Sequence, residues 1–161
     1  MTYNEVRADE NIRVYIAESD RTLAELGFTE HSFAHVTAVA EKAGYILETM
    51  GYPVRTVELA KIAGYLHDIG NLVNRVDHSQ SGAVMAFRLL DKMNFPANEI
   101  AEITAAIGNH DEGTGVPVSP LAAALILADK SDVRRTRVRN PDTSKFDIHD
   151  RVNFAAISSV L

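Results

Sequence analysis

Imidazole and carboxylate side chains recur where the apolar segments of this 161-residue sequence end or begin. A catalytic site for two metal ions needs several neutral imidazoles, a carboxylate that can bridge the ions, and a second carboxylate. These groups must converge from several helices, because no single helix can surround an ion. Five segments supply such a set: His35, His67, Asp68, His78, His110 and Asp129. We therefore expect these six side chains to bind metal.

Two spacings within this set carry further information. His67 and Asp68 are neighbours, and neighbouring side chains on a helix diverge by about 100°. The two groups can then straddle one ion, which leaves the second oxygen of Asp68 for another. His31 lies four residues before His35, and this spacing permits a shared metal or an outer-shell role. The sequence has no cysteine, so any metal must be held by histidine and carboxylate.

The order of these residues resembles the HD superfamily of metal-dependent phosphohydrolases. His35 opens the phrase HVTAVAEKA, His67 and Asp68 lie in LHDIGN, and Asp129 lies in LILADKSD. The resemblance spans residues 28 to 140. His78 in HSQSGA and His110 in NHDEGTGVP resemble the additional histidines of the dinuclear branches, among them the HD-GYP cyclic dinucleotide phosphodiesterases and the dinucleoside tetraphosphate hydrolases.

This resemblance implies an enzyme in which His67 and Asp68 are catalytic. It further implies two divalent metal ions, with the transition metals iron or manganese first, and nickel, cobalt, zinc or the non-transition metal magnesium as other choices. The reaction would be hydrolysis of a phosphoester or phosphoanhydride, in a nucleotide or a small phosphorylated metabolite, by a metal-activated water. The alternative is a catalytically reduced HD-domain module that binds a ligand or regulates another protein.

The alternative rests on two departures from the HD-GYP pattern. Asn71 replaces the lysine that follows HDIG in those proteins, and Asn109 replaces the first of two consecutive histidines. The segment between Asp68 and His78 is also much shorter than in HD-GYP proteins, so a cyclic di-GMP phosphodiesterase is not the first choice. Both asparagines are kept as auxiliary site residues.

Basic and acidic residues near the predicted ligands have two interpretations each. If one helix continues past Asp129, then Lys130, Arg134 and Arg137 form a stripe that can hold substrate phosphates. The same cations would otherwise complement the dipole at the C-terminal end of the helix. Three carboxylates near the ligands have a catalytic or outer-shell role, or are ordinary loop residues: Asp111, Glu112 and Asp132. His149 falls outside the pattern, and we expect it at the surface.

Apolar residues recur at helical spacing in six segments, with short connections between them. The predicted helices cover residues 10–26, 29–50, 53–66, 79–93, 96–107 and 119 to before 141. This pattern favours an all-α, HD-domain helical bundle of about six helices, with no sheet. We expect an HD phosphohydrolase domain over residues 1–141. Residues 142–161 fit neither the helical nor the strand period, so we predict no secondary structure for them. They could also be the start of a truncated region of a larger regulatory protein.

The composition is that of a soluble globular domain, with 46% hydrophobic and 24% charged residues. A net charge of −6 argues against nucleic acid as a partner. The N-terminus is polar and acidic, unlike a secretory signal, and the apolar run over residues 121–128 is too short to span a membrane. We therefore expect a cytoplasmic protein whose partner is a small phosphorylated substrate, a nucleotide first. A homo-oligomer remains open.

Overall fold

The computed structural model describes residues 1–160 and is all-α, as predicted. It contains eight α-helices and three short 3-10 helices, and residues 1–160 contain no strand. The α-helices are α1 (Tyr3–Ala8), α2 (Glu10–Glu25), α3 (Phe33–Thr49), α4 (Val54–Leu66), α5 (His78–Lys92), α6 (Ala97–Gly108), α7 (Pro120–Lys130) and α8 (Ile148–Ala155). The 3-10 helices are η1 (Ile69–Leu72), η2 (Arg135–Arg137) and η3 (Thr143–Lys145).

The prediction of about six helices was low because it missed the helices at the two ends of the chain. Helix α1 has only six residues, too few for a periodic pattern, although Thr2 and Glu5 form the capping box that marks its start. Helix α8 lacks a buried apolar stripe, since Ile148, Val152 and Phe154 are all exposed. Residues 142–161 therefore have no apolar pattern at helical spacing from which α8 could be predicted.

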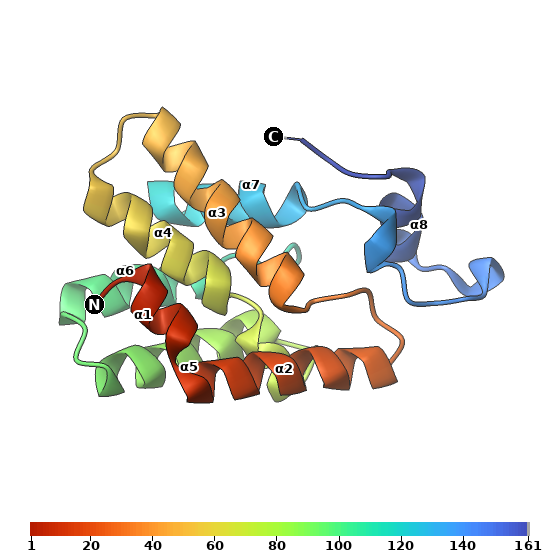
Figure 1. The fold of residues 1–161 in the computed structure, drawn as a ribbon, viewed down its shortest axis with the longest axis horizontal. Coiled ribbons are helices and arrows are strands. Elements are labelled where there is room, and N and C mark those ends of the chain that lie inside the picture. The colour runs from red at the N-terminus through yellow and green to blue at the C-terminus, as the bar shows by residue number, and fades with distance from the viewer. Residues whose placement is uncertain (161) are drawn as a thin grey trace.

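Helices α3 and α4 form an antiparallel pair, with α7 packed against both and α6 against α4 (Figure 1). Helix α4 lies at the centre of this arrangement, and its second half is buried on nearly every side. Gly64 makes the close approach possible, because a Cβ at this position would lie 2.7 Å from the Cα of Ala40 on α3. The approach brings His67, directly after α4, next to His35 in the first turn of α3.

A second close approach joins η1 to the start of α5. A Cβ on Gly70 would collide with the carbonyl oxygen of His78 and with the backbone nitrogen of Gly82. Because Gly70 has no side chain, His78 comes within reach of Asp68, just before η1. Two glycines thus place predicted ligands from three segments beside one another.

Helix α7 ends at Lys130, so the basic stripe predicted beyond Asp129 is not helical. The backbone nitrogen of Arg134 donates to the side chain of Asn153 at 3.1 Å, and that of Arg135 donates to the carbonyl of Ala156 at 2.7 Å. These hydrogen bonds tie the chain to the C-terminal segment instead of continuing the helix. Lys130, Arg134 and Arg137 therefore do not form one face.

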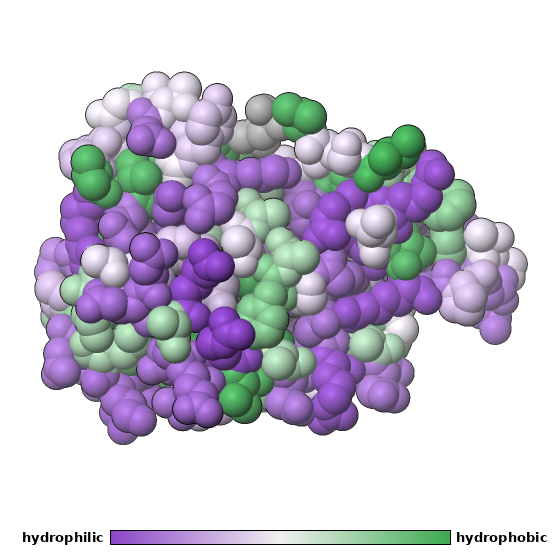
Figure 2. All heavy atoms as spheres, viewed as in Figure 1, coloured by the Kyte–Doolittle hydropathy of each residue, from purple (hydrophilic) through white to green (hydrophobic). Residues whose placement is uncertain are grey.

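The face shown in Figure 2 is largely hydrophilic, with scattered hydrophobic side chains. Exposed apolar residues of the C-terminal segment include Ile148, Ile157 and Val160. Among the helices of residues 1–160, none combines the length and the apolar character needed to cross a membrane.

Candidate metal centre

Five imidazoles share one arrangement. The Nδ1 atom forms a hydrogen bond with another residue, and the Nε2 atom faces the interior of the site. The Nδ1 partners are the carbonyl of Thr29 for His31 (2.6 Å), Asp132 for His35 (2.7 Å), and the carbonyls of Gly64 for His67 (2.8 Å), Arg75 for His78 (3.1 Å) and Ile107 for His110 (2.7 Å). Carbonyl and carboxylate oxygens only accept, so Nδ1 donates, and Nε2 is the atom that carries the free lone pair whenever the imidazole is neutral. This is the usual orientation of metal-binding histidines.

Three of these hydrogen bonds have the same spacing in the sequence. His67, His78 and His110 each donate to the carbonyl three residues earlier, at the end of α4, the start of α5 and the end of α6. The helix ends supply carbonyls that lack a partner within the helix. At His67 and His110, the hydrogen bond that satisfies a carbonyl at the end of the helix therefore also orients the imidazole ring.

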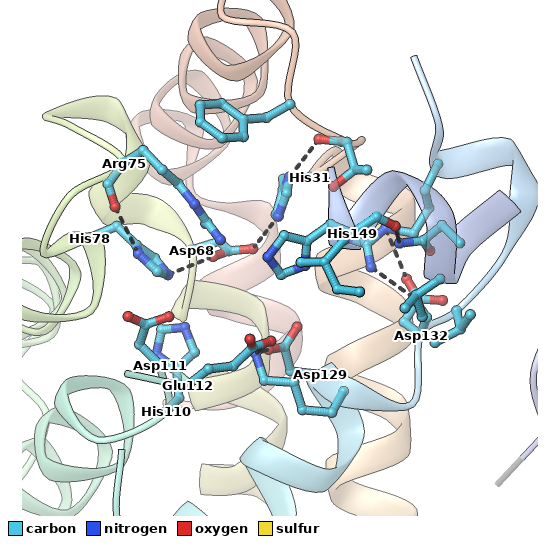
Figure 3. Close-up of a pocket in the computed structure, with 18 residues that line it drawn as sticks. His31, Asp68, Arg75, His78, His110, Asp111, Glu112, Asp129, Asp132 and His149 are labelled. Atoms are coloured by element: carbon cyan, nitrogen blue, oxygen red, sulfur yellow. Dashed lines mark hydrogen bonds and ion pairs between the residues drawn. The ribbon is translucent and has the colours of Figure 1, made fainter. Parts of the chain in front are cut away.

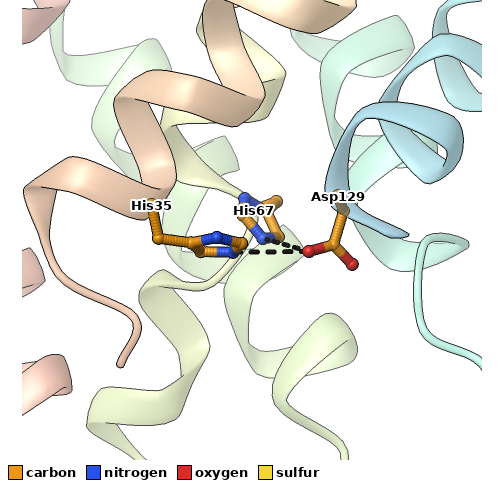
Figure 4. Close-up of side chains that lie close together, drawn as sticks. All are labelled: His35, His67 and Asp129. Atoms are coloured by element: carbon orange, nitrogen blue, oxygen red, sulfur yellow. Dashed lines mark ion pairs between the residues drawn. The ribbon is translucent and has the colours of Figure 1, made fainter. Parts of the chain in front are cut away.

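Figure 4 shows the first group of converging side chains, from α3, the end of α4 and α7. The Oδ1 atom of Asp129 lies 3.3 Å from Nε2 of His35 and 3.6 Å from Nε2 of His67. One ligand atom from each residue lies within 4.8 Å of the other two. Both imidazoles are fully buried. This spacing suits three ligands of one ion.

A second group consists of His67, Asp68 and His110, whose ligand atoms also lie within 4.8 Å of one another. The carboxylate of Asp68 faces both groups. Its Oδ2 atom lies 3.4 Å from Nε2 of His35 and 3.0 Å from Nε2 of His67, whereas its Oδ1 atom lies 3.5 Å from Nε2 of His78. Asp68 thus has the position of a bridging carboxylate.

Three atoms at the centre are buried and have no hydrogen-bond partner within residues 1–160: Nε2 of His35, Nε2 of His67 and Oδ2 of Asp68. Leaving a buried polar atom unpaired costs about 1–3 kcal/mol, so three in one place call for a ligand. Imidazole nitrogen and carboxylate oxygen are ligands that divalent transition metals accept. The residues present therefore fit a metal centre.

The carboxylates hold protons on the two central imidazoles in the absence of metal. Burial by itself lowers the pKa of His35, but the nearby carboxylates of Asp129, Asp132 and Asp68 outweigh it and raise this pKa to about 9. Burial is likewise outweighed at His67, where mainly Asp68 and Asp129 raise the pKa to about 10. At His110 burial dominates and lowers the pKa to about 4. Metal binding must displace the protons on His35 and His67.

Asn71 positions the central carboxylate. Its Nδ2 atom donates to Oδ1 of Asp68 at 3.0 Å, and its Oδ1 atom accepts from Arg75 at 3.2 Å. Asn109 points elsewhere, because its amide donates to the carbonyl of Ala105 at 2.9 Å. The two asparagines that we grouped from the sequence therefore have different surroundings.

His31 reaches the site from a loop. Helix α3 begins at Phe33, after the N-cap Ser32, so His31 is not one turn before His35 on the same helix. The backbone nitrogen of His31 donates to Asp20 at 2.9 Å, and its Nε2 atom lies 3.9 Å from Oδ2 of Asp68. Burial lowers its pKa to about 3, so its imidazole is neutral beside the centre.

A pocket of about 210 Å³ opens onto the candidate metal centre (Figure 3). Lys130 lines it, but its ammonium group is paired with Asp129 at 2.8 Å and Glu112 at 3.0 Å. Arg134 is not among the lining residues, and it pairs with Glu30 at 2.8 Å and Asp132 at 3.2 Å. The two basic residues predicted to hold phosphate thus have carboxylate partners of their own.

Two titratable residues that line the pocket, Arg75 and His149, were not predicted as site residues from the sequence, and the role of a third, Asp132, was left open. Arg75 lies in a loop without any periodic signal, and His149 was expected at the surface but lines the pocket from α8. Asp132 binds His35, which is the outer-shell role that we considered for it. Its place three residues after Asp129 was the available signal.

The HD domain family matches residues 32–134, which include all six predicted metal ligands but neither His31 nor α8. The chain is 26% identical to an uncharacterized protein of Methanocaldococcus jannaschii, over 99% of this chain and 70% of that protein. It is 36% identical to Ribonuclease Y of Lawsonia intracellularis over 65% of this chain, which is 18% of that protein.

A solved structure is also similar, that of a predicted HD superfamily hydrolase from an uncultured Thermotogales bacterium. The TM-score is 0.59 at 29% identity, and the match covers 74% of this chain and 65% of the other. The present chain therefore spans less than two thirds of that solved chain, and a still smaller part of the Lawsonia protein.

Proposed function

Because the chain belongs to the HD domain family, we propose that it is a metal-dependent phosphohydrolase. One observation carries the proposal: buried Nε2 atoms and a two-sided carboxylate converge on one centre without protein partners. A protein that needed these histidines only for stability would pair such atoms internally.

Each residue has a separate task in this proposal. His35, His67, Asp68 and Asp129 would hold one ion, and Asp68, His78 and His110 would hold a second, with iron or manganese as first choices. Bound divalent ions supply activation of water and neutralisation of phosphate charge. Asn71 keeps Asp68 in place, and Asp132 keeps the ring of His35 in place.

The substrate class that we propose is a nucleotide or another small phosphorylated metabolite. The support is the pocket, which is lined both by metal-site residues and by apolar side chains such as Phe28, Ile148 and Val152. A substrate with a phosphate group and an organic part matches this combination of polar and apolar lining residues. The site offers no cysteine, so a thiol nucleophile is excluded.

A second candidate substrate is a phosphodiester in RNA, which the similarity to a protein named Ribonuclease Y favours. The net charge of −6 opposes it, as do the carboxylates of Asp111 and Glu112 at the pocket. Polynucleotide binding normally relies on a basic surface. We therefore rank it below a small substrate.

The experiment is a substrate screen on protein stripped with chelator and reloaded separately with Mn²⁺, Fe²⁺, Co²⁺, Ni²⁺, Zn²⁺ or Mg²⁺. The panel contains nucleoside phosphates, dinucleoside polyphosphates, cyclic nucleotides, sugar phosphates and a single-stranded RNA. We expect turnover in the loaded wild type and in the surface variant Arg88→Ala, and none in His67→Ala. Ligand-induced thermal stabilisation without product from any substrate would favour the binding-module alternative and overturn the hydrolase.

A further inference from the structure

Arg75 is a cation in the pocket without a carboxylate partner among residues 1–160. Its guanidinium donates to Oδ1 of Asn71 at 3.2 Å and lies 5.9 Å from the ring centre of Phe28. Figure 3 shows this side chain extending from its loop toward Asp68. A guanidinium held by an amide and an aromatic ring keeps most of its donors free for an anion.

His149 enters the same pocket from α8. Figure 3 shows its imidazole directed inward, toward Asp68 and the other metal-site residues. The side chain forms no hydrogen bond to any part of residues 1–160, although its carbonyl accepts from Asn153 at 2.9 Å. An inward imidazole without a protein partner is available to a ligand.

Helix α8 lies beyond the segment that the HD domain family covers. Its attachment is nevertheless specific, because Asn153 accepts from the backbone of Arg134 and Ala156 accepts from that of Arg135. These bonds hold the face that carries His149 and Val152 against the pocket. This part of the pocket lining therefore lies outside the segment that the family model matches.

The charged groups are distributed unevenly around the pocket. Asp111 and Glu112 lie on the side of the loop that follows α6, near His110, and Glu112 is paired with Lys130. Arg75 and His149 come from two other segments. An anion beside the candidate metal centre would be repelled by Asp111 and Glu112 and attracted by Arg75.

We propose that Arg75 and His149 form a clamp that binds the phosphate group of the substrate next to the metal centre. This inference deepens the proposed function and rests on it. Arg75 supplies a fork of N–H donors that fits phosphate oxygens, and His149 supplies a donor from α8. The apolar side chains of Ile148 and Val152 then face the organic part of a phosphate ester.

The clamp is tested by measuring the dissociation constant of inorganic phosphate for manganese-loaded protein by calorimetry. Arg75→Met keeps the aliphatic stem but removes the charge, and His149→Ala removes the imidazole. We expect both variants to bind phosphate roughly tenfold or more weakly than the wild type, as loss of a hydrogen bond to a charged group predicts. The conservative variants Arg75→Lys and His149→Gln should recover part of this loss.

Two exposed arginines serve as matched controls, Arg88→Ala on α5 and Arg151→Ala on α8, and both should bind phosphate like the wild type. Manganese content is measured in every variant, so that a lost metal is not mistaken for a lost phosphate contact. Unchanged phosphate affinity in Arg75→Met and His149→Ala at full metal content overturns the clamp, as does a loaded wild type that binds no phosphate.

Failure of the clamp and failure of the proposed function give different results. If the wild type hydrolyses a phosphate ester and KM is unmoved in Arg75→Met, the clamp is wrong and the hydrolase stands. If no substrate is hydrolysed but phosphate affinity falls in both variants, the clamp stands in a protein that binds phosphate without turnover.

Discussion

The Nδ1 atom of His35 on α3 lies 2.7 Å from Oδ2 of Asp132, a residue of the loop that follows α7. Both side chains are buried. Asp132 is itself fixed, because its Oδ1 atom accepts from Arg134 at 3.2 Å and its carbonyl accepts from Arg137 at 2.7 Å. A residue 97 positions away in the sequence therefore sets the orientation of a central imidazole.

Replacing Asp132 should weaken metal binding without removing a ligand. We expect Asp132→Ala to lower metal affinity roughly 10- to 100-fold, the usual effect of losing the partner of a metal-binding histidine. Asp132→Asn retains an acceptor oxygen and should lose less. Competition titration against a metal indicator measures both, with the exposed Asp91→Ala as control. Equal affinity in all four proteins would contradict this role.

Asn71 should be intolerant of a carboxylate. Asn71→Asp replaces the amide donor 3.0 Å from Oδ1 of Asp68 with a second acidic group in a fully buried position. We expect the free energy of unfolding of chelator-treated protein to fall by about 1–3 kcal/mol. Urea denaturation measures it.

The matched control for this change is Asn74→Asp in the same loop. The side chain of Asn74 accepts from the backbone of Val76 at 2.9 Å, and an aspartate can keep that hydrogen bond. Its stability should therefore equal that of the wild type. The role assigned to Asn71 is wrong if the two variants unfold alike.

Gly64→Ala tests whether the approach of α3 and α4 builds the site. The new methyl group would lie 2.7 Å from the Cα of Ala40, so the helices must separate, at a cost of about 1–3 kcal/mol. Metal content should fall too, because His35 and His67 move apart. At Gly108 a methyl group would make an ordinary 3.6 Å contact with Ala83, and Gly108→Ala should retain stability and metal. Full metal content in Gly64→Ala would contradict this account.

Metal affinity should rise with pH. The pKa values of His35 and His67 are raised to about 9 and about 10 in the metal-free protein, whereas a metal binds only the neutral imidazole. Below these values each imidazole must release a proton on binding, so acid favours the metal-free state. Affinity should increase up to about tenfold per pH unit for each proton released. Titrations across pH 6 to 8 measure the slope, and an affinity independent of pH would exclude proton release.

The all-α class and the central helices could be predicted because their apolar faces repeat with the helical period. The ends of the chain could not: Tyr3 and Val6 of α1 are buried within a helix of six residues, and the apolar side chains of α8 remain exposed. The end of α7 was missed for a different reason. Beyond Lys130 the chain forms hydrogen bonds from Arg134 and Arg135 to Asn153 and Ala156, which no local pattern reveals.

Some residues of the candidate site could likewise be predicted from the sequence, and others could not. Its six predicted ligands are brought together as expected, because His67 and His110 follow helix ends that orient them locally. Their role as ligands stays a prediction. Arg75 and His149 escaped notice because a loop and an exposed helix carry them, and only the tertiary fold places them in the pocket.

The most direct test of the central claim is the metal content per chain, by elemental analysis of protein purified without chelator and of the His67→Ala and His110→Ala variants. A centre with two ions predicts about two equivalents in the wild type and a lower value in both variants. About one equivalent that survives His110→Ala would contradict the second ion. No metal in the wild type, even after reconstitution, would contradict the metal centre itself.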